Sequence, residues 1–370
     1  MLEGIMKMLE QTAFAELTLG NILMFGVALA ILYISVKKDA EPLLLVPIAF
    51  GIILGNIPLS GIRDEGGLLW YLYQGVSMGI YPPLIFLGIG ALTDFSFMLS
   101  YPLTIFLGGA AQVGIFTAFL VARLLGFNVR EAASIGVIGG ADGPTAIYTA
   151  SRFSPDLLFA IAIAAYSYIA LIPIVQPVVS KLLVTKKEMA IRMKPPRRVS
   201  KTERVLFPVV VTVLSALLIP QSLPLVGMLM FGNLLREVGN VKRLVEAASR
   251  FILDSVTLIL MVCVGSSAQA DKFLHPVSLK IFALGAFAFV CSLSGGILFA
   301  KFMNLFLKDK LNPLIGAAGV SAVPTSARVA QKLASEVDPT NFILMHAMSP
   351  NVAGVIGSAV AAGVFLTLLK

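Results

Sequence analysis

Charged residues are scarce in this sequence of 370 residues. Asp, Glu, Lys and Arg together make up only 13% of the chain, whereas 58% of the residues are hydrophobic. The mean hydropathy is +0.92. A soluble domain needs about 25% charged residues to cover its surface. The shortage of charge therefore excludes an ordinary soluble domain.

Cysteine and histidine are also rare, with two of each. Cys263 and Cys291 both lie inside apolar runs, so we interpret them as small core residues and not as a disulfide or metal pair. His275 and His346 are isolated from each other and from other ligand-type residues, which argues against a zinc or haem site.

Hydrophobic residues occur in blocks of about 17–25, the length that a helix needs to cross ~30 Å of hydrocarbon. The sequence therefore predicts an all-α polytopic membrane protein with about 10–11 transmembrane segments. The expected spans are 20–36, 41–59, 66–80, 82–97, 101–124, 155–180, 205–222, 223–238, 251–270, 275–307 and 339–370. A break is expected at Tyr81-Pro82-Pro83, because proline interrupts the helical hydrogen-bond ladder.

The net charge of +8 is concentrated in one segment. Nine of the 28 Lys and Arg residues lie within 181–204. A basic loop between apolar spans is the positive-inside signal, so we place 181–204 in the cytoplasm and expect no nucleic-acid partner. Binding to anionic membrane lipid or to a cytoplasmic protein is the alternative role of these charges.

The first 18 residues carry Glu3, Glu10 and Glu16 and lack a basic start followed by an uninterrupted apolar core. We therefore expect no cleavable signal peptide. An amphipathic helix that lies on the membrane surface is the preferred interpretation of 1–18.

Two glycine-rich segments match at a constant spacing of 180 residues: IGVIGGADGPTAIYTAS at 135–151 and IGAAGVSAVPTSARVAQ at 315–331. The matching positions are Gly136 with Gly316, Gly139 with Gly319, and Pro144-Thr145 with Pro324-Thr325. A weaker match relates 85–102 to 260–276. We predict an internal duplication into membrane repeats at 19–180 and 205–370. The inverted orientation is preferred, although the sequence itself leaves the orientation open.

The segment GGADGPT at 139–145 is poorly suited to a plain helix. Gly139 and Gly140 permit unusual backbone angles, and Pro144 breaks the hydrogen-bond ladder. Such a break inside a membrane survives only when it is buried in protein, where its free carbonyls can bind an ion. An Asp at the bilayer centre costs about 2.5–3.5 kcal/mol, so Asp142 is predicted to have a function. The alternative is an external loop that leaves Asp142 solvated.

The matching segment in the second half, 311–330, offers neutral ligands. Its polar residues are Asn312, Ser321, Thr325, Ser326 and Arg328. One carboxylate with several neutral oxygens suits a monovalent cation better than a divalent one. Arg328 has three interpretations: a counter-charge to Asp142, a group that holds an anionic substrate, or a positive residue at a helix end near the interface.

Further polar groups occur within apolar spans. They are Tyr166, Ser167 and Tyr168 in 162–173, and Ser349, Asn351 and Ser358 in 347–359. We interpret Tyr166 as a packing aromatic whose hydroxyl is hydrogen-bonded.

At GGADGPTAI (139–147) the sequence resembles the β subunit of the sodium-transporting carboxylic-acid decarboxylases. The resemblance extends over nearly the whole chain. It includes GIYPPLIFLGIGALTDF (79–95), AAYSYIALIPIVQP (164–177), LNPLIGAAGVSAVPTSARV (311–329) and HAMSPNVAGVIGSAVAAGV (346–364).

The resemblance implies a membrane subunit that decarboxylates carboxybiotin, consumes a proton and drives sodium outward. Its implied partners are a carboxyltransferase α subunit, a biotin carrier protein or domain, and a small single-span γ or δ subunit, in an oligomeric complex in the bacterial cytoplasmic membrane. The implied sodium ligands are Asp142, Asn312, Gly316, Ser321 and Asn351. Asp142, Tyr168 and Arg328 are the catalytic residues that the resemblance implies, which couple decarboxylation to sodium transport.

Two other interpretations accompany this one. A sodium-coupled secondary transporter of an organic anion would have a similar site, and the absence of a biotinylated partner would identify it. Met6-Lys7-Met8 matches a biotin-attachment motif, but the compact β domain that carries such a lysine is missing, so we regard the match as coincidental.

Overall fold

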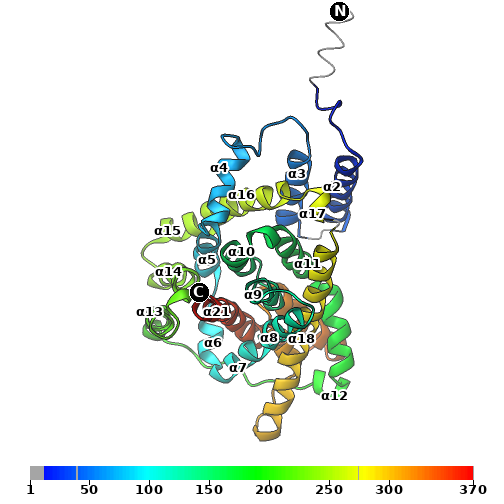
Figure 1. The fold of residues 1–370 in the computed structure, drawn as a ribbon. Coiled ribbons are helices and arrows are strands. Elements are labelled where there is room, and N and C mark those ends of the chain that lie inside the picture. Colours follow the sequence, from blue (N-terminus) through cyan, green and yellow to red (C-terminus); the bar gives the residue numbers. More distant parts are fainter. Residues whose placement is uncertain (1–11, 39–40, 274, 370) are drawn as a thin grey trace, which may run out of the picture.

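The computed structural model describes residues 12–38, 41–273 and 275–369, and all of their regular elements are helices (Figure 1). The first half of the chain forms α2 (Leu19–Lys38), α3 (Pro42–Gly55), α4 (Leu68–Ser77), α5 (Tyr81–Leu92), α6 (Ser96–Ser100), α7 (Ile105–Ala111), α8 (Val113–Leu124), α9 (Val129–Val137), α10 (Gly143–Phe153) and α11 (Leu158–Leu183). The short α12 (Lys186–Met189) lies in the basic loop. The second half forms α13 (Lys201–Leu218), α14 (Leu223–Val238), α15 (Lys242–Glu246), the π-helix η5 (Ala247–Ile252), α16 (Leu253–Ser266), α17 (Ala270–Phe273), α18 (Pro276–Phe306), α19 (Leu314–Ala317), α20 (Thr325–Val337) and α21 (Leu344–Leu368).

Within the described residues, six helical stretches are long and apolar enough to cross a membrane, and the bent pair α4–α5 makes a seventh. These stretches are Leu19–Lys37, Pro102–Leu124, Pro155–Leu183, Lys242–Ser266, Pro276–Phe306 and Leu344–Leu368. The expected membrane-protein class is thereby confirmed. The larger count of 10–11 segments includes shorter helices such as α3 and stays a prediction.

Prolines and glycines break the helices where the sequence predicts. Helix α4 ends at Ser77 and α5 begins at Tyr81, with a bend of 70° between them. Gly79 lies in this break with φ of +70°, a conformation that glycine adopts without steric cost. Part of the expected amphipathic segment 1–18 lies outside the described residues, and its described part, 12–18, contains turns.

The two halves of the chain interlock through close glycine contacts. A Cβ on Gly51 of α3 would lie 2.3 Å from the Val262 carbonyl oxygen of α16. In the same way, a Cβ on Gly90 of α5 would lie 1.9 Å from the Leu229 carbonyl oxygen of α14. Small residues let membrane helices approach this closely. Thus α3 and α5 of the first half each pack on a helix of the second half.

Two helical hairpins enter the middle of the bundle. Hairpin 1 (128–154) consists of α9, the 3₁₀ turn Ile138–Gly140 and α10, and the Ser134 hydroxyl of α9 lies 3.1 Å from the Ser154 hydroxyl that follows α10. Hairpin 2 (312–341) consists of α19, the irregular stretch 318–324 and α20. Each hairpin turns back on itself near its centre, as expected for interrupted helices.

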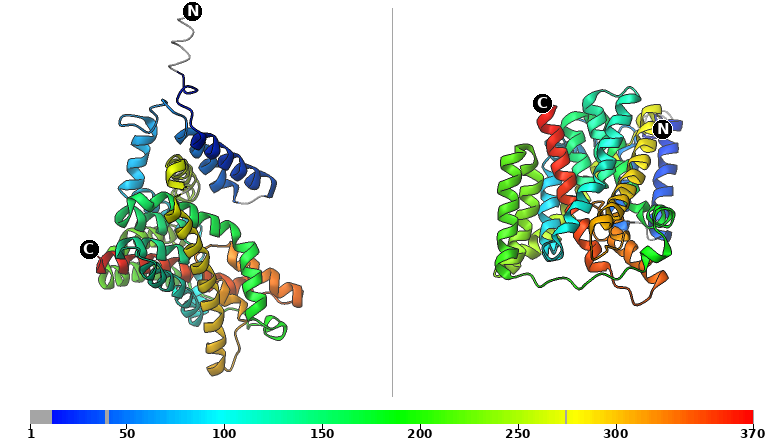
Figure 2. Two further views of the ribbon diagram at one scale, coloured as in Figure 1. Left: turned by 45° about the vertical axis from the view of Figure 1, so that its right-hand side comes forward. Right: turned by 90° about the horizontal axis from the view of Figure 1, so that it is seen from below.

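The hairpins enter from opposite ends of α11. Hairpin 1 leads directly into the start of α11 through Pro155–Leu157. The basic loop follows the other end of α11, and both flanks of hairpin 2 are bound to that loop: Asn312 and Asn341 each donate to the carbonyl oxygens of Met189 and Ile191. The right-hand view of Figure 2 shows the green basic loop along one end of the bundle and the red C-terminal end at the other. An inverted repeat predicts this opposite entry, although the duplication itself stays a prediction.

Candidate cation site

The tips of the two hairpins meet in the centre of the bundle. The Ser321 amide of hairpin 2 donates to the Gly140 carbonyl oxygen of hairpin 1 at 3.0 Å. Ala141, the next residue, has a φ of +52°. This left-handed conformation is uncommon for alanine and costs roughly 1–2 kcal/mol, so surrounding contacts must hold it. It turns the chain so that Asp142 caps the N-terminus of α10.

Asp142 is the N-cap of α10 and is only 5% exposed. Its Oδ1 accepts a hydrogen bond from the Thr145 amide at 3.2 Å. A carboxylate at this position satisfies an amide that the helix leaves free and lies at the positive end of the helix dipole. Helix α10 therefore stabilises the charged form of a side chain that burial otherwise destabilises.

Ser358 of α21 joins Asp142 to hairpin 2. Its hydroxyl donates to Asp142 Oδ2 at 2.5 Å, and the Ser321 hydroxyl donates to Ser358 at 3.1 Å. No described Lys or Arg forms an ion pair with Asp142. The carboxylate thus accepts from an amide of α10 and a hydroxyl of α21, and it pairs with no cation of the described residues.

Asn351 of α21 shapes the tip of hairpin 2. Its amide nitrogen donates to the carbonyl oxygens of Ala318 at 2.9 Å and Val320 at 2.6 Å. The side-chain oxygen of Asn351 is buried and has no hydrogen-bond partner. Since buried polar atoms are normally paired, an unpaired amide oxygen beside a hairpin tip is suited to bind a cation.

Gln112 brings a second unpaired oxygen to this region. It lies at the break between α7 and α8, and its amide nitrogen donates to the Gly108 carbonyl oxygen at 2.9 Å. Its buried Oε1 has no partner and lies 3.5 Å from where a Cβ on Gly140 would be. Gln112 therefore adjoins the tip of hairpin 1.

The two tyrosines of α11 have different neighbours. A Cβ on Gly143 would lie 2.3 Å from the ring of Tyr166, so this ring covers the first residue of α10, directly after Asp142. The Tyr168 hydroxyl donates to the Phe282 carbonyl oxygen on α18, and its ring stacks on Phe289 with centroids 6.5 Å apart. The tyrosine interpreted as a packing residue is thus the one beside the carboxylate.

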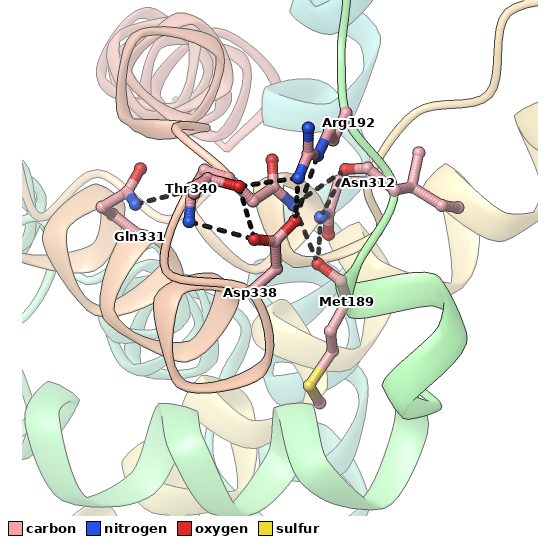
Figure 3. A network of polar contacts seen from close by, with 8 residues as sticks. Met189, Arg192, Asn312, Gln331, Asp338 and Thr340 are labelled. Atoms are coloured by element: carbon pink, nitrogen blue, oxygen red, sulfur yellow. Dashed lines mark hydrogen bonds and ion pairs between the residues drawn. The ribbon is translucent and has the colours of Figure 1, made fainter.

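Asn312 lies at the base of hairpin 2 instead of at its tip (Figure 3). Its amide nitrogen binds the Met189 and Ile191 carbonyl oxygens at 2.7 and 3.0 Å, and its Oδ1 accepts from the Leu314 amide at 3.1 Å. The two bonds from the amide nitrogen join hairpin 2 to the basic loop, and the bond to Oδ1 lies within the hairpin. Asn312 has no hydrogen bond to Asp142 within the described structure.

An ion pair adjoins Asn312 in the same network. Arg192 of the basic loop donates to Asp338 Oδ2 at 2.8 Å, and the Thr340 hydroxyl donates to Oδ1 at 2.6 Å (Figure 3). The Thr340 hydroxyl and the Arg192 guanidinium hold the pKa of Asp338 down at about 2. This contact between the loop and hairpin 2 is therefore charged throughout the physiological pH range.

Gly316 and Arg328 also lie apart from the carboxylate. A Cβ on Gly316 would lie 2.2 Å from the Gly296 carbonyl oxygen of α18, so this glycine permits close packing of hairpin 2. Arg328 is exposed on α20. The structure thus links Asp142 to Ser321 through Ser358 and places Asn351 against the same hairpin tip as Ser321. Within the described residues, Asn312, Gly316, Tyr168 and Arg328 form no hydrogen bond with the carboxylate.

Comparison with known proteins identifies the family. A family model for the β subunit of Na⁺-transporting oxaloacetate decarboxylase matches residues 20–369. The methylmalonyl-CoA decarboxylase β subunit of Propionigenium modestum is 50% identical over 393 residues, covering 100% of both chains. The glutaconyl-CoA decarboxylase β subunit of Acidaminococcus fermentans is 49% identical over 363 residues, which is 98% of this chain and 97% of that one. The oxaloacetate decarboxylase β chain of Klebsiella pneumoniae is 43% identical over 427 residues, covering 99% of both.

The family model matches nearly the whole chain, and the match takes in the helices that form the membrane fold. The buried carboxylate between two hairpins fits the sodium transport that the family name describes. This chain belongs to the family of Na⁺-transporting oxaloacetate decarboxylase β subunits, and it is a decarboxylase and sodium-translocating subunit.

Proposed function

We propose that this subunit decarboxylates carboxybiotin and uses the released energy to carry sodium outward through a site at the tips of the two hairpins. The observation that carries the proposal is Asp142, a buried carboxylate that pairs with no cation of the described residues, at the meeting point of hairpins that enter from opposite ends of α11. A site at such a meeting point is separated from either surface by one hairpin, so a small shift can open it to either side.

The proposed sodium ligands are Asp142, Ser321 and Asn351, to which we add the unpaired oxygen of Gln112. Asn312 and Gly316, also expected as ligands, are assigned a different contribution here: they fix hairpin 2 against the basic loop and α18. This division follows from their contacts, since the amide nitrogen and the oxygen of Asn312 already have partners.

In this proposal, the coupling of decarboxylation to sodium transport depends on the charge of Asp142. Sodium neutralises the buried carboxylate and so lowers the cost of moving the site through the low-dielectric interior. After sodium leaves, a proton takes its place, because a buried carboxylate that loses its cation gains proton affinity.

Decarboxylation breaks the bond between the carboxyl carbon and the ureido nitrogen of biotin. The electron pair stays on the nitrogen, which takes up the proton, and CO₂ leaves.

The proposed partners are a biotin carrier, a carboxyltransferase α subunit and a small γ or δ subunit, with the basic loop on the cytoplasmic side of the bacterial cytoplasmic membrane. Relatives of similar identity are named for methylmalonyl-CoA, glutaconyl-CoA and oxaloacetate. We infer that the carboxylic acid is selected on another subunit. An avidin-detectable partner in the purified complex distinguishes this proposal from an organic-anion transporter, which needs none.

The test is Asp142→Asn in the purified complex, assayed for decarboxylation of free carboxybiotin with and without sodium. We expect the sodium-stimulated activity to be lost, because the amide keeps the side-chain shape and removes the charge. Asp309→Asn is the matched control: Asp309 is 69% exposed and pairs with Lys194. Full sodium-dependent activity in Asp142→Asn would refute the assignment.

A further inference from the structure

A basic pocket lies apart from the hairpins, where α14 meets α15 and the π-helix η5. It is an open depression of about 420 Å³, lined by Arg236, Lys242, Glu246, Ser249 and Arg250, together with Gly239 and Val245. Three positive side chains and one negative side chain give the lining a net charge of +2. The pocket is therefore suited to an anion.

Two of the three cations are available to a ligand. Arg236 is already held by Asp94 at 3.4 Å and by the Leu92 carbonyl oxygen. The Lys242 ammonium forms no hydrogen bond or ion pair with the described part of the chain. Arg250 has only Glu246, at 3.7 Å on the same helical face. Ser249 adds a hydroxyl beside them.

The π-helix shapes this site. Residues 247–252 form a wider turn than an α-helix, with i→i+5 hydrogen bonds, and they contain Ser249 and Arg250. Such single-turn π segments inside longer helices frequently occur at functional sites. Here the segment lies within the apolar stretch Lys242–Ser266, near its polar start.

The position of the pocket favours a lipid over a free anion. Arg204, at the start of α13, pairs with Glu237 at 3.3 Å, so the pocket lies at the same end of the bundle as the basic loop. Large exposed apolar side chains lie next to the lining residues in the sequence: Phe251 is 68% exposed and Leu244 is 54% exposed. Cations beside exposed apolar side chains at a membrane surface match a phosphate head group with its acyl chains.

We propose that this pocket binds the phosphate of an anionic phospholipid, with Lys242, Arg250 and Ser249 as the recognition groups. The site is independent of the sodium site and of the proposed coupling. Free phosphate shares the head-group chemistry, and the experiment separates the two sources.

The test uses the full-length purified protein in nanodiscs and measures retained phosphatidylglycerol by native mass spectrometry. The double variant Lys242→Gln/Arg250→Gln should weaken retention about tenfold or more, since each cation near a membrane surface contributes about a fivefold factor in affinity. Ser249→Leu, which fills the pocket and keeps its charge, should weaken it as well. Lys186→Gln/Lys187→Gln, a change of equal charge in exposed α12 of the basic loop, measures what surface charge alone contributes and should weaken retention less than the pocket variant.

Two results would overturn the proposal. Equal loss in the α12 control and the pocket variant would show that surface charge alone retains the lipid. Displacement of phosphatidylglycerol by millimolar inorganic phosphate, or equal retention of phosphatidylcholine, would show that the pocket does not recognise an anionic lipid. Unfolding temperature is compared among the variants, and Ser249→Leu provides the test if the double variant fails to fold.

Discussion

The carboxylate of Asp142 has to remain usable in a place that disfavours charge. The Thr145 amide and the Ser358 hydroxyl both donate to it, and hydrogen bonds to charged groups contribute about 1.5–3 kcal/mol each. Together they offset a cost of a few kcal/mol for a central carboxylate. The balance leaves a group that sodium or a proton can neutralise in turn.

Ser358→Ala should therefore weaken sodium binding. Without this donor the anion of Asp142 is less stable, so the proton competes better with sodium. We expect the sodium concentration that gives half-maximal decarboxylation to rise on the order of tenfold, the equivalent of a 1.4 kcal/mol loss.

Thr367→Ala is the control for this measurement. Thr367 lies on the same helix, and its hydroxyl donates only to the Gly363 carbonyl oxygen of that helix, at 2.8 Å. Its removal should leave the sodium dependence unchanged. An unaltered half-saturating concentration in Ser358→Ala would mean that the Asp142–Ser358 hydrogen bond does not contribute to the sodium site.

At the scale of elements, the walls of the site depend on how closely helices approach. Helix α21 carries Asn351 and Ser358, and α7 leads directly to Gln112. The two helices pack through Gly108, where a Cβ would lie 2.7 Å from Ala353 and 2.8 Å from the Pro350 carbonyl oxygen. This glycine fixes the distance between two walls of the site.

Gly108→Ala should separate α7 from α21 and destabilise the protein by about 1–3 kcal/mol, the usual cost of an added methyl group in a filled interior. The neighbouring Gly109 is a matched control, because a Cβ there meets no atom within 4 Å. Thermal unfolding in detergent should give a lower midpoint for Gly108→Ala than for Gly109→Ala. Equal midpoints would contradict this packing of α7 on α21.

The sequence predicts the breaks between elements better than the contacts across them. Local chemistry determines the break at 139–145, because Gly139, Gly140 and Pro144 act on their own backbone. The bond between Asp142 and Ser358 joins residues 216 positions apart, so it depends on tertiary packing. Which tyrosine of α11 lies beside Asp142 depends on the rotation of that helix, which α10 and α18 set together.

For the whole molecule, the proposed transport requires that the site can face either side, and the opposite entry of the two hairpins would allow this. Hairpin 1 begins after the exposed segment 123–126, whereas the base of hairpin 2 is fastened to the basic loop. The 29 residues of Pro155–Leu183 separate these two bases, a length that spans a bilayer. The closed site between the tips is then one hairpin away from each aqueous phase.

Single cysteines test this arrangement directly. The chain contains two cysteines, Cys263 and Cys291, which are replaced by alanine as background. Arg130→Cys reports the base of hairpin 1, and Thr340→Cys reports the base of hairpin 2; both native residues are exposed. We expect a membrane-impermeant maleimide to label them from opposite sides, with position 340 labelled only in inside-out vesicles.

Since both bases lie at surfaces and not at the sodium site, labelling is independent of activity. Labelling of both positions from one side would place the hairpins in the same aqueous phase, and a site between their tips could not then alternate between the two phases.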